Sequence, residues 1–107
     1  MKTFQQFIEK VDSTMLIEFA IKLLGVGQED VYKRNGNAVL RGVISDLLYR
    51  YSDITQVEIG RCLGIEHSAV SKLRNNLKQS MTADDNLAKL FKTIESAIIH
   101  HFSNFKI

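Results

Sequence analysis

Apolar residues recur at helical spacing along most of the chain, and no stretch alternates apolar and polar residues for long enough to indicate a strand. The clearest pattern predicts a central helix over 37–51, with apolar residues at i, i+3, i+4, i+7, i+8 and i+11: Leu40, Val43, Ile44, Leu47, Leu48 and Tyr51. A second stripe predicts a closing helix over about 83–102: Leu87, Leu90, Phe91, Ile94 and Ile98. These patterns predict an all-α fold of five to six helices in a single domain, 1–107.

Start and stop signals divide the N-terminal part of the chain. A first helix is predicted over about 3–11. Asp12 or Ser13 then caps a second helix, which Gly25 ends by taking a left-handed conformation. A short helix or turn near 28–32 leads into the polar loop KRNGN.

Capping boxes mark two later helix starts. Thr55 is followed three residues on by Glu58, so the hydroxyl can accept from the Glu58 amide while the carboxylate reaches back to Thr55. Thr82 with Asp85 is a weaker form of the same signal before the closing helix.

Residues 55–76, TQVEIGRCLGIEHSAVSKLRNN, match the positional requirements of a helix-turn-helix over about 55–79. Gly60 supplies the small residue needed where the helices approach closely, and Gly64 tolerates the positive φ of the turn. Apolar residues stand at the remaining five constrained positions, which face the core: Ile59, Leu63, Ile65, Val70 and Leu73. The alternative is a packed pair of helices with no role in DNA binding.

If the motif reads DNA, its second helix presents hydrogen-bonding side chains to the bases of the major groove: His67, Ser68, Ser71, Lys72 and Asn75. Ala69 is small enough to contact a thymine methyl group, and Arg74 and Lys78 are expected at phosphates. Glu66 either accepts from a cytosine amine or caps the helix, and capping is the favoured interpretation. For Arg50, at the end of the central helix, a phosphate contact and a solvated side chain are left open.

The charge of the chain adds to this picture through its distribution. The net charge is only +2, but residues 31–80 carry eight basic residues against four acidic ones, and this segment contains the motif. An apolar content of 45% and a charged content of 24% are ordinary for a globular domain. No membrane span and no signal peptide is expected, so the predicted location is cytoplasmic, with the nucleoid. The single cysteine, Cys62, is expected to be a packing residue.

The block over 33–77, KRNGNAVLRGVISDLLYRYSDITQVEIGRCLGIEHSAVSKLRNNL, resembles the C-terminal DNA-binding domain of the bacterial replication initiator DnaA. It is also similar to the C-terminal domain of REP-associated tyrosine transposases, and both belong to the Trp-repressor-like helical group. The likeness extends over about 5–99, through VEIGR, EHSAV and TADDNLAKLFKTIESAI.

This resemblance implies three groups of DNA contacts. His67, Ser68 and Ala69 would lie at bases; Lys33, Arg34 and Arg41 would belong to a basic loop at the minor groove; and Arg61, Lys72 and Arg74 would lie near the backbone. The stretch LGIEHSAV is one residue shorter than its counterpart and lacks an arginine, and Glu66 and Ala69 replace an aspartate and a threonine. These departures argue against binding to the initiator's own DNA site.

The expected function is therefore sequence-specific binding of double-stranded DNA, in transcription regulation, replication control or a mobile element. No enzymatic activity, cofactor or metal is expected, because the chain has no GxxxxGK[ST] phosphate loop and the adjacent His100 and His101 point apart on a helix. The alternative is a helical protein-interaction module that regulates an initiator or polymerase without binding DNA. A homodimer is left open, and so is the packing of the apolar tail with Phe102 and Phe105: on the core or at a dimer contact.

Overall fold

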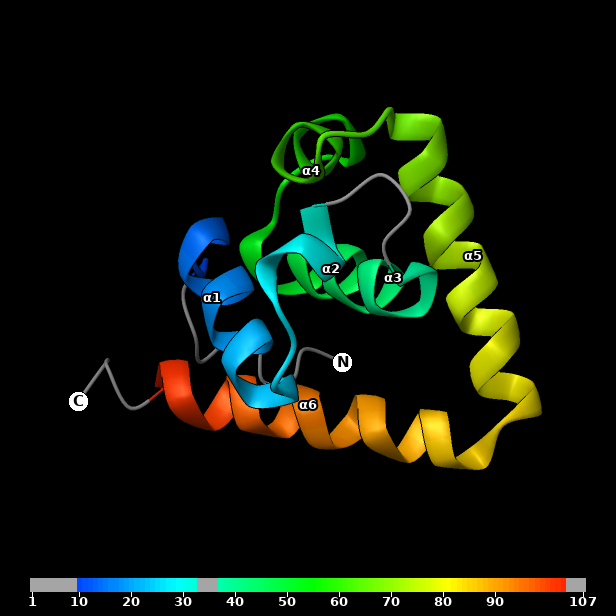
Figure 1. Cartoon of the computed structure of the whole chain (residues 1–107). Helices are drawn as coiled ribbons and strands as arrows, with labels where there is room; N and C mark the ends of the chain where they lie inside the picture. Colours follow the sequence, from blue (N-terminus) through cyan, green and yellow to red (C-terminus); the bar gives the residue numbers. More distant parts are fainter. Residues whose placement is uncertain (1–9, 33–36, 104–107) are drawn as a thin grey trace.

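The computed structural model describes residues 10–32 and 37–103, which form an all-α domain with no strand in these two ranges (Figure 1). The elements are α1 (Ser13–Leu24), α2 (Gln28–Tyr32), α3 (Ala38–Leu47), the π-helical segment η2 (Leu48–Ser52), α4 (Gln56–Leu63), α5 (His67–Ala83) and α6 (Asp85–Ser103). Most of the helix predicted over 3–11 lies outside the described residues, and residues 10–12 are not helical.

The predicted ends of α1 are confirmed. The Asp12 carboxylate accepts a hydrogen bond from the Met15 amide at 3.1 Å, which satisfies one of the amides at the start of the helix. Gly25, with a φ of 67°, ends the helix in the left-handed conformation. Between these caps Leu16, Ile17 and Ala20 are buried, so α1 turns one face to the core.

The central helix is buried on more than its predicted stripe. All six residues of that stripe are buried, and Asn37 caps α3 by accepting from the Leu40 amide at 3.0 Å. Polar residues between them are buried as well: Arg41, Ser45 and Asp46. A single stripe was therefore too narrow a prediction, because α5 packs on a second face of α3 at Gly42.

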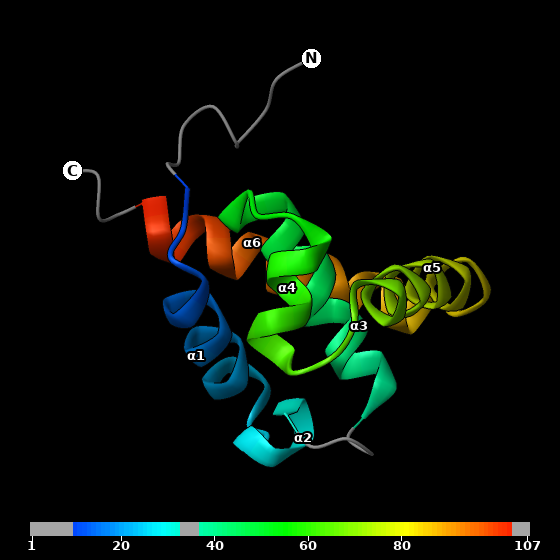
Figure 2. The ribbon, with the colours of Figure 1, turned by 90° about the horizontal axis from the view of Figure 1, so that it is seen from above.

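Helices α5 and α6 form a frame around α3. In Figure 1, α5 descends along one side from α4 to α6, and α6 continues beneath α3 towards α1. Seen from above in Figure 2, α5 stands out at one edge of the molecule. This placement leaves one long face of α5 outside the core.

The boundary between α5 and α6 differs from the prediction. α5 extends to Ala83, and the Thr82 hydroxyl donates to the Lys78 carbonyl at 3.0 Å inside that helix. Asp84 caps α6 instead, with its carboxylate accepting from the amides of Asn86 at 3.0 Å and Leu87 at 3.3 Å. The predicted Thr82–Asp85 capping box is therefore wrong, because the longer α5 moves the cap by two residues.

The C-terminal end of α6 packs on α1. Phe102 is only 8% exposed, and its ring meets that of Phe19 edge-on at a centroid distance of 5.6 Å. Of the two arrangements left open for the tail, Phe102 takes the one against the core, while Phe105 lies outside the described residues. None of the helices in the described ranges is both long and apolar enough to span a membrane.

Candidate nucleic-acid interface

The helix pair α4–α5 begins with the capping box that the sequence predicts. The Glu58 amide donates to the Thr55 hydroxyl at 3.2 Å, and the Thr55 amide donates to the Glu58 carboxylate at 3.0 Å. The hydrogen bonds from the backbone and hydroxyl of Thr55 lower the pKa of the Glu58 carboxyl below its ordinary value. The start of α4 is thus defined by local contacts.

A tight turn joins α4 to α5. Gly64 has a φ of 73°, a conformation that side chains with a Cβ rarely adopt. The Ile65 amide then donates to the Gly60 carbonyl at 2.8 Å. A Cβ on Gly60 would collide with the Ile65 carbonyl oxygen, so the closeness of the turn depends on this glycine. The roles predicted for Gly60 and Gly64 are confirmed.

Packing fixes the inner side of the pair. Ile59 and Leu63 of α4 are buried, as are Val70 and Leu77 of α5. Leu73 is only partly buried, yet its backbone meets Gly42 of α3, where a Cβ would stand 2.9 Å from the Leu73 carbonyl oxygen. Gly42 is a residue that the sequence reasoning missed, although a glycine inside a helical pattern is a recognised signal of close packing.

The outer side of α5 is polar. Five predicted contact residues are exposed: His67, Ser68, Lys72, Asn75 and Lys78. Ala69 and Ser71 are partly buried on the same first two turns, and Arg61 is exposed on α4. The helical spacing places four of these residues towards one side of α5: His67, Ser68, Lys72 and Asn75. The six residues predicted to contact bases thus lie on the first turns of α5, four of them exposed and two partly buried. We call this surface the α5 face: His67, Ser68, Ala69, Ser71, Lys72 and Asn75.

Glu66 does not have the role that the sequence favoured. It occupies the N-cap position of α5, and its carbonyl accepts from the amides of Ala69 and Val70 at 3.0 and 3.1 Å. Its side chain, however, makes no capping hydrogen bond and is exposed. The capping prediction is wrong, and the carboxylate stands at the head of the α5 face.

Arg74 turns inward rather than towards a phosphate. Its Nε lies 3.0 Å from Oδ1 of Asp46, and one of its terminal nitrogens donates to Oε1 of Gln56 at 3.1 Å. The guanidinium also stacks over the Tyr49 ring, 3.9 Å from its centroid. A phosphate contact by Arg74 would have to compete with these three partners.

Arg50 is likewise engaged within the protein. Its Nε lies 2.8 Å from Oδ2 of Asp46, and a terminal nitrogen lies 3.1 Å from Oε2 of Glu95. The Tyr51 hydroxyl donates to the same Glu95 oxygen at 2.9 Å, and burial together with this bond raises the pKa of Tyr51. The Arg50 side chain is nevertheless 41% exposed, so it is both paired within the protein and partly solvated, while its contact with a phosphate stays a prediction.

The predicted basic loop is described only in part. Lys33 and Arg34 lie outside the described residues, so their predicted role at the minor groove stays a prediction. Arg41 lies in α3, not in the loop, and is 7% exposed. Its assignment to the loop is wrong, because the helix starts at Ala38 and turns this position inward.

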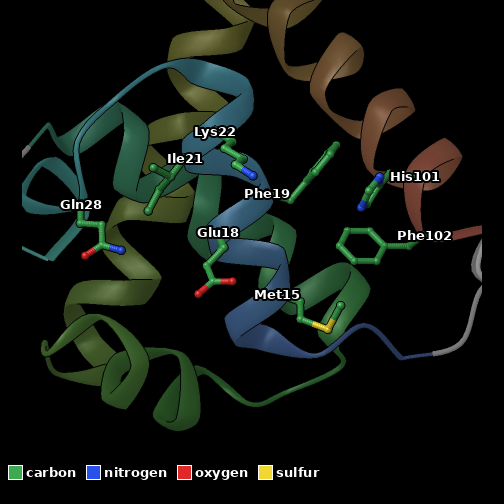
Figure 3. A pocket seen from close by; sticks show the side chains of 8 residues that line it. All are labelled: Met15, Glu18, Phe19, Ile21, Lys22, Gln28, His101 and Phe102. Atoms are coloured by element: carbon green, nitrogen blue, oxygen red, sulfur yellow. The ribbon is translucent and has the colours of Figure 1, made fainter.

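A groove lies against α1, away from the α5 face (Figure 3). It has a volume of about 620 Å³ and lies where α1 and α2 meet the end of α6; its lining is Met15, Glu18, Phe19, Ile21, Lys22, Gln28, His101 and Phe102. The rings of Phe19 and His101 stack at 4.3 Å, so the end of α6 forms one wall. No predicted contact residue of the α5 face lines it.

In the described ranges, no three His, Cys, Asp or Glu side chains gather as a potential metal site. Comparison with known proteins adds no assignment: no family model, no curated protein and no solved structure matches this chain.

Proposed function

We propose that this chain binds double-stranded DNA in a sequence-specific manner, with α4 and α5 acting as a helix-turn-helix of the Trp-repressor-like or DnaA C-terminal-like kind. The observation that carries the proposal is the α5 face. Its polar residues occupy the first turns of a helix that stands out at the edge of the molecule, as Figure 2 shows. The N-terminal residues of a recognition helix are those that reach base edges.

The chemistry of the α5 face suits base recognition. Lys72 can donate to guanine O6 and N7, and Asn75 can pair with adenine through N6 and N7. His67 and Ser68 each offer a donor or an acceptor, and Ala69 presents a methyl group to thymine. Small residues between longer ones would let the helix approach the groove closely.

Phosphate contacts would come from the borders of this surface. Arg61 on α4 and Lys78 further along α5 are both exposed. Lys33 and Arg34, by sequence, add a basic segment that would lie at a neighbouring minor groove. Such contacts release counterions and make affinity fall with salt, but carry no sequence information. We place the activity in transcription regulation, replication control or a mobile element.

The test is selection from a randomised duplex library at two salt concentrations. The proposal predicts an enriched motif whose affinity falls steeply with salt, and the symmetry of that motif would show whether one chain or a homodimer binds. Absence of both enrichment and low-salt binding would refute it.

A second candidate, a protein-interaction module, is favoured by one observation. The Glu66 carboxylate is exposed at the head of the α5 face, where it would repel DNA phosphates unless it accepts from a cytosine amine. The Glu66→Gln variant separates the two candidates. Tighter DNA binding or a changed base preference is expected for a DNA reader, whereas an interaction module should bind DNA neither as the wild type nor as this variant.

A further inference from the structure

A buried carboxylate joins two arginines from different parts of the fold. Asp46 of α3 is 1% exposed. Its Oδ1 lies 3.0 Å from Nε of Arg74 on α5, and its Oδ2 lies 2.8 Å from Nε of Arg50 in η2. Each carboxylate oxygen therefore has a cationic neighbour, as a buried charge requires. Only Oδ1 also accepts a hydrogen bond, which Arg74 donates; the contact of Oδ2 with Arg50 is an ion pair without hydrogen-bond geometry.

Arg74 connects α5 to three other elements at once. Its guanidinium reaches Asp46 in α3, Gln56 at the start of α4 at 3.1 Å, and the Tyr49 ring in η2 at 3.9 Å. We call these four residues the α5 clamp: Asp46, Arg74, Gln56 and Tyr49. The planar guanidinium can satisfy all three partners only in one orientation, because its donors are fixed in direction.

The α5 clamp restricts rotation of α5 about its own axis, which apolar packing restricts less strongly. The contact of Gly42 with the Leu73 carbonyl sets how closely α5 approaches α3. Apolar contacts have little directional preference, so they restrict a roll of α5 about its own axis less strongly. Side-chain ends stand about 6 Å from a helix axis, so a roll of about 10° moves them by about 1 Å. A displacement of that size is enough to spoil a recognition geometry.

We propose that Asp46, acting through Arg74, is a positioning residue that sets the sequence discrimination of the α5 face. This inference rests on the proposed DNA-binding function and deepens it. Arg74 is one turn from Ser71 and adjacent to Asn75 in sequence, so the clamp holds α5 beside the side chains proposed to read bases. Arg74 itself then acts inside the protein and contributes no phosphate contact.

The experiment compares the full chain with the variants Asp46→Asn and Arg74→Lys on a selected duplex and on a scrambled duplex. Arg74→Lys keeps the charge but loses the planar group that contacts Asp46, Gln56 and Tyr49 together. Both variants should lose about tenfold or more in affinity for the selected duplex, the size of one lost base contact. Affinity for the scrambled duplex and the salt dependence should stay unchanged, since no phosphate contact is removed.

Glu95→Gln is the matched control for a merely structural effect. It weakens the contacts of Arg50 and Tyr51 to α6 and leaves the α5 clamp intact. It should lower the thermal stability while the ratio of selected to scrambled affinity stays at the wild-type value. If Glu95→Gln lowers this ratio as much as Asp46→Asn does, the role of Asp46 is general stability and the proposal is overturned.

A second substitution of Arg74 tests whether this side chain contacts the protein or the DNA backbone. Arg74→Gln should leave the salt dependence unchanged if Arg74 acts inside the protein. A decrease of the salt slope by about one phosphate contact would overturn the proposal, because Arg74 would then touch the DNA backbone.

Backbone amide hydrogen exchange separates failure of this inference from failure of the proposed function. Asp46→Asn should raise exchange in the first turns of α5 in the absence of DNA. If the wild type binds no DNA, the proposed function fails and the positioning role fails with it. If the wild type selects a motif but Asp46→Asn retains both wild-type exchange and wild-type discrimination, only the positioning role is overturned.

Discussion

Gly42 in α3 lies directly against the backbone of Leu73 in α5. A Cβ placed on Gly42 would stand 2.9 Å from the Leu73 carbonyl oxygen and 3.4 Å from the Cβ of Leu77. The nearest neighbour is a backbone atom of a helix, which cannot move aside as the end of a flexible side chain can. This contact therefore sets the distance between the central helix and the helix that carries the α5 face.

The Gly42→Ala variant should be destabilised in spite of the better helix propensity of alanine. Overpacking of this kind costs about 1–3 kcal/mol, which outweighs the gain of about 1 kcal/mol from replacing a helical glycine. The expected result is a lower free energy of unfolding in urea. A Gly42→Ala variant more stable than the wild type would show that α5 can shift without cost.

Gly64→Ala provides the contrast, because a Cβ there meets no atom within 4 Å. Its cost should come from the positive φ alone, about 1–2 kcal/mol. Asparagine tolerates the left-handed conformation better than alanine, so Gly64→Asn should recover part of the loss. No such recovery is expected for Gly42→Asn, and chemical denaturation of the four variants would establish the difference.

Features that depend on residues close in sequence were predicted well. The apolar stripe of α3, the capping box at Thr55 and the glycines of the α4–α5 turn depend on residues close in sequence, so spacing alone reveals them. The Thr82–Asp85 box failed because α5 continues to Ala83, so Thr82 lies inside that helix and Asp84 becomes the cap of α6.

Long-range polar contacts could not be predicted in the same way. Asp46 and Arg74 are 28 residues apart, and the pattern around Arg74 does not indicate which side chain lies opposite. From the sequence alone, an arginine that flanks an exposed helical face is expected at a phosphate. The Asp46–Arg50 ion pair differs from the Asp46–Arg74 contact because it can be predicted from sequence spacing. Opposite charges at i and i+4 are expected to meet on a helix.

Alanine at the positions proposed to read bases and at those proposed to contact phosphates should have different effects on DNA binding. His67→Ala and Lys72→Ala are expected to cost about 1–3 kcal/mol on the selected duplex and to relax the preference at one position each. Arg61→Ala, Lys78→Ala and Arg34→Ala should weaken binding to all sequences and decrease the salt slope by about one each. Titrations on selected and scrambled duplexes at several salt concentrations would measure both effects. Equal losses on both duplexes for His67→Ala would contradict base reading by that residue.

The capping box at Thr55 and Glu58 should make the free energy of unfolding depend on pH in the acid range. The pKa of Glu58 is lowered in the folded chain, so the unfolded chain binds the proton more readily. The contribution of Glu58 is therefore complete above the ordinary value of 4.5 and decreases as the pH falls through the folded pKa. The stability difference between the wild type and Glu58→Gln should be largest near neutral pH and shrink below that value. A difference that stays constant from pH 7 to pH 3 would contradict this assignment.

At alkaline pH, the free energy of unfolding should decrease through ionisation of Tyr51. Burial and the hydrogen bond to Glu95 raise the Tyr51 pKa above 10.0, so the unfolded chain loses this proton first. Its contribution is complete below pH 10 and decreases as the pH rises further. Tyr51→Phe should be less stable than the wild type by about 0.5–1.5 kcal/mol at neutral pH, through loss of the 2.9 Å bond to Glu95. Above pH 10 this difference should shrink, as measured by urea denaturation across the range.

The end of α6 should contribute strongly to stability through Phe102. Its ring is 8% exposed and contacts those of Phe19 and His101, at centroid distances of 5.6 and 4.8 Å. Phe102→Ala removes this packing from the junction of α6 with α1 and should cost about 3–5 kcal/mol. Leu90→Ala on the same helix is the matched control: Leu90 is 48% exposed, so its truncation should change the free energy of unfolding by about 0.5 kcal/mol or less. Similar small losses for both variants would contradict the packing of this end on α1, whereas a large loss for Phe102→Ala alone would show that α6 is anchored there.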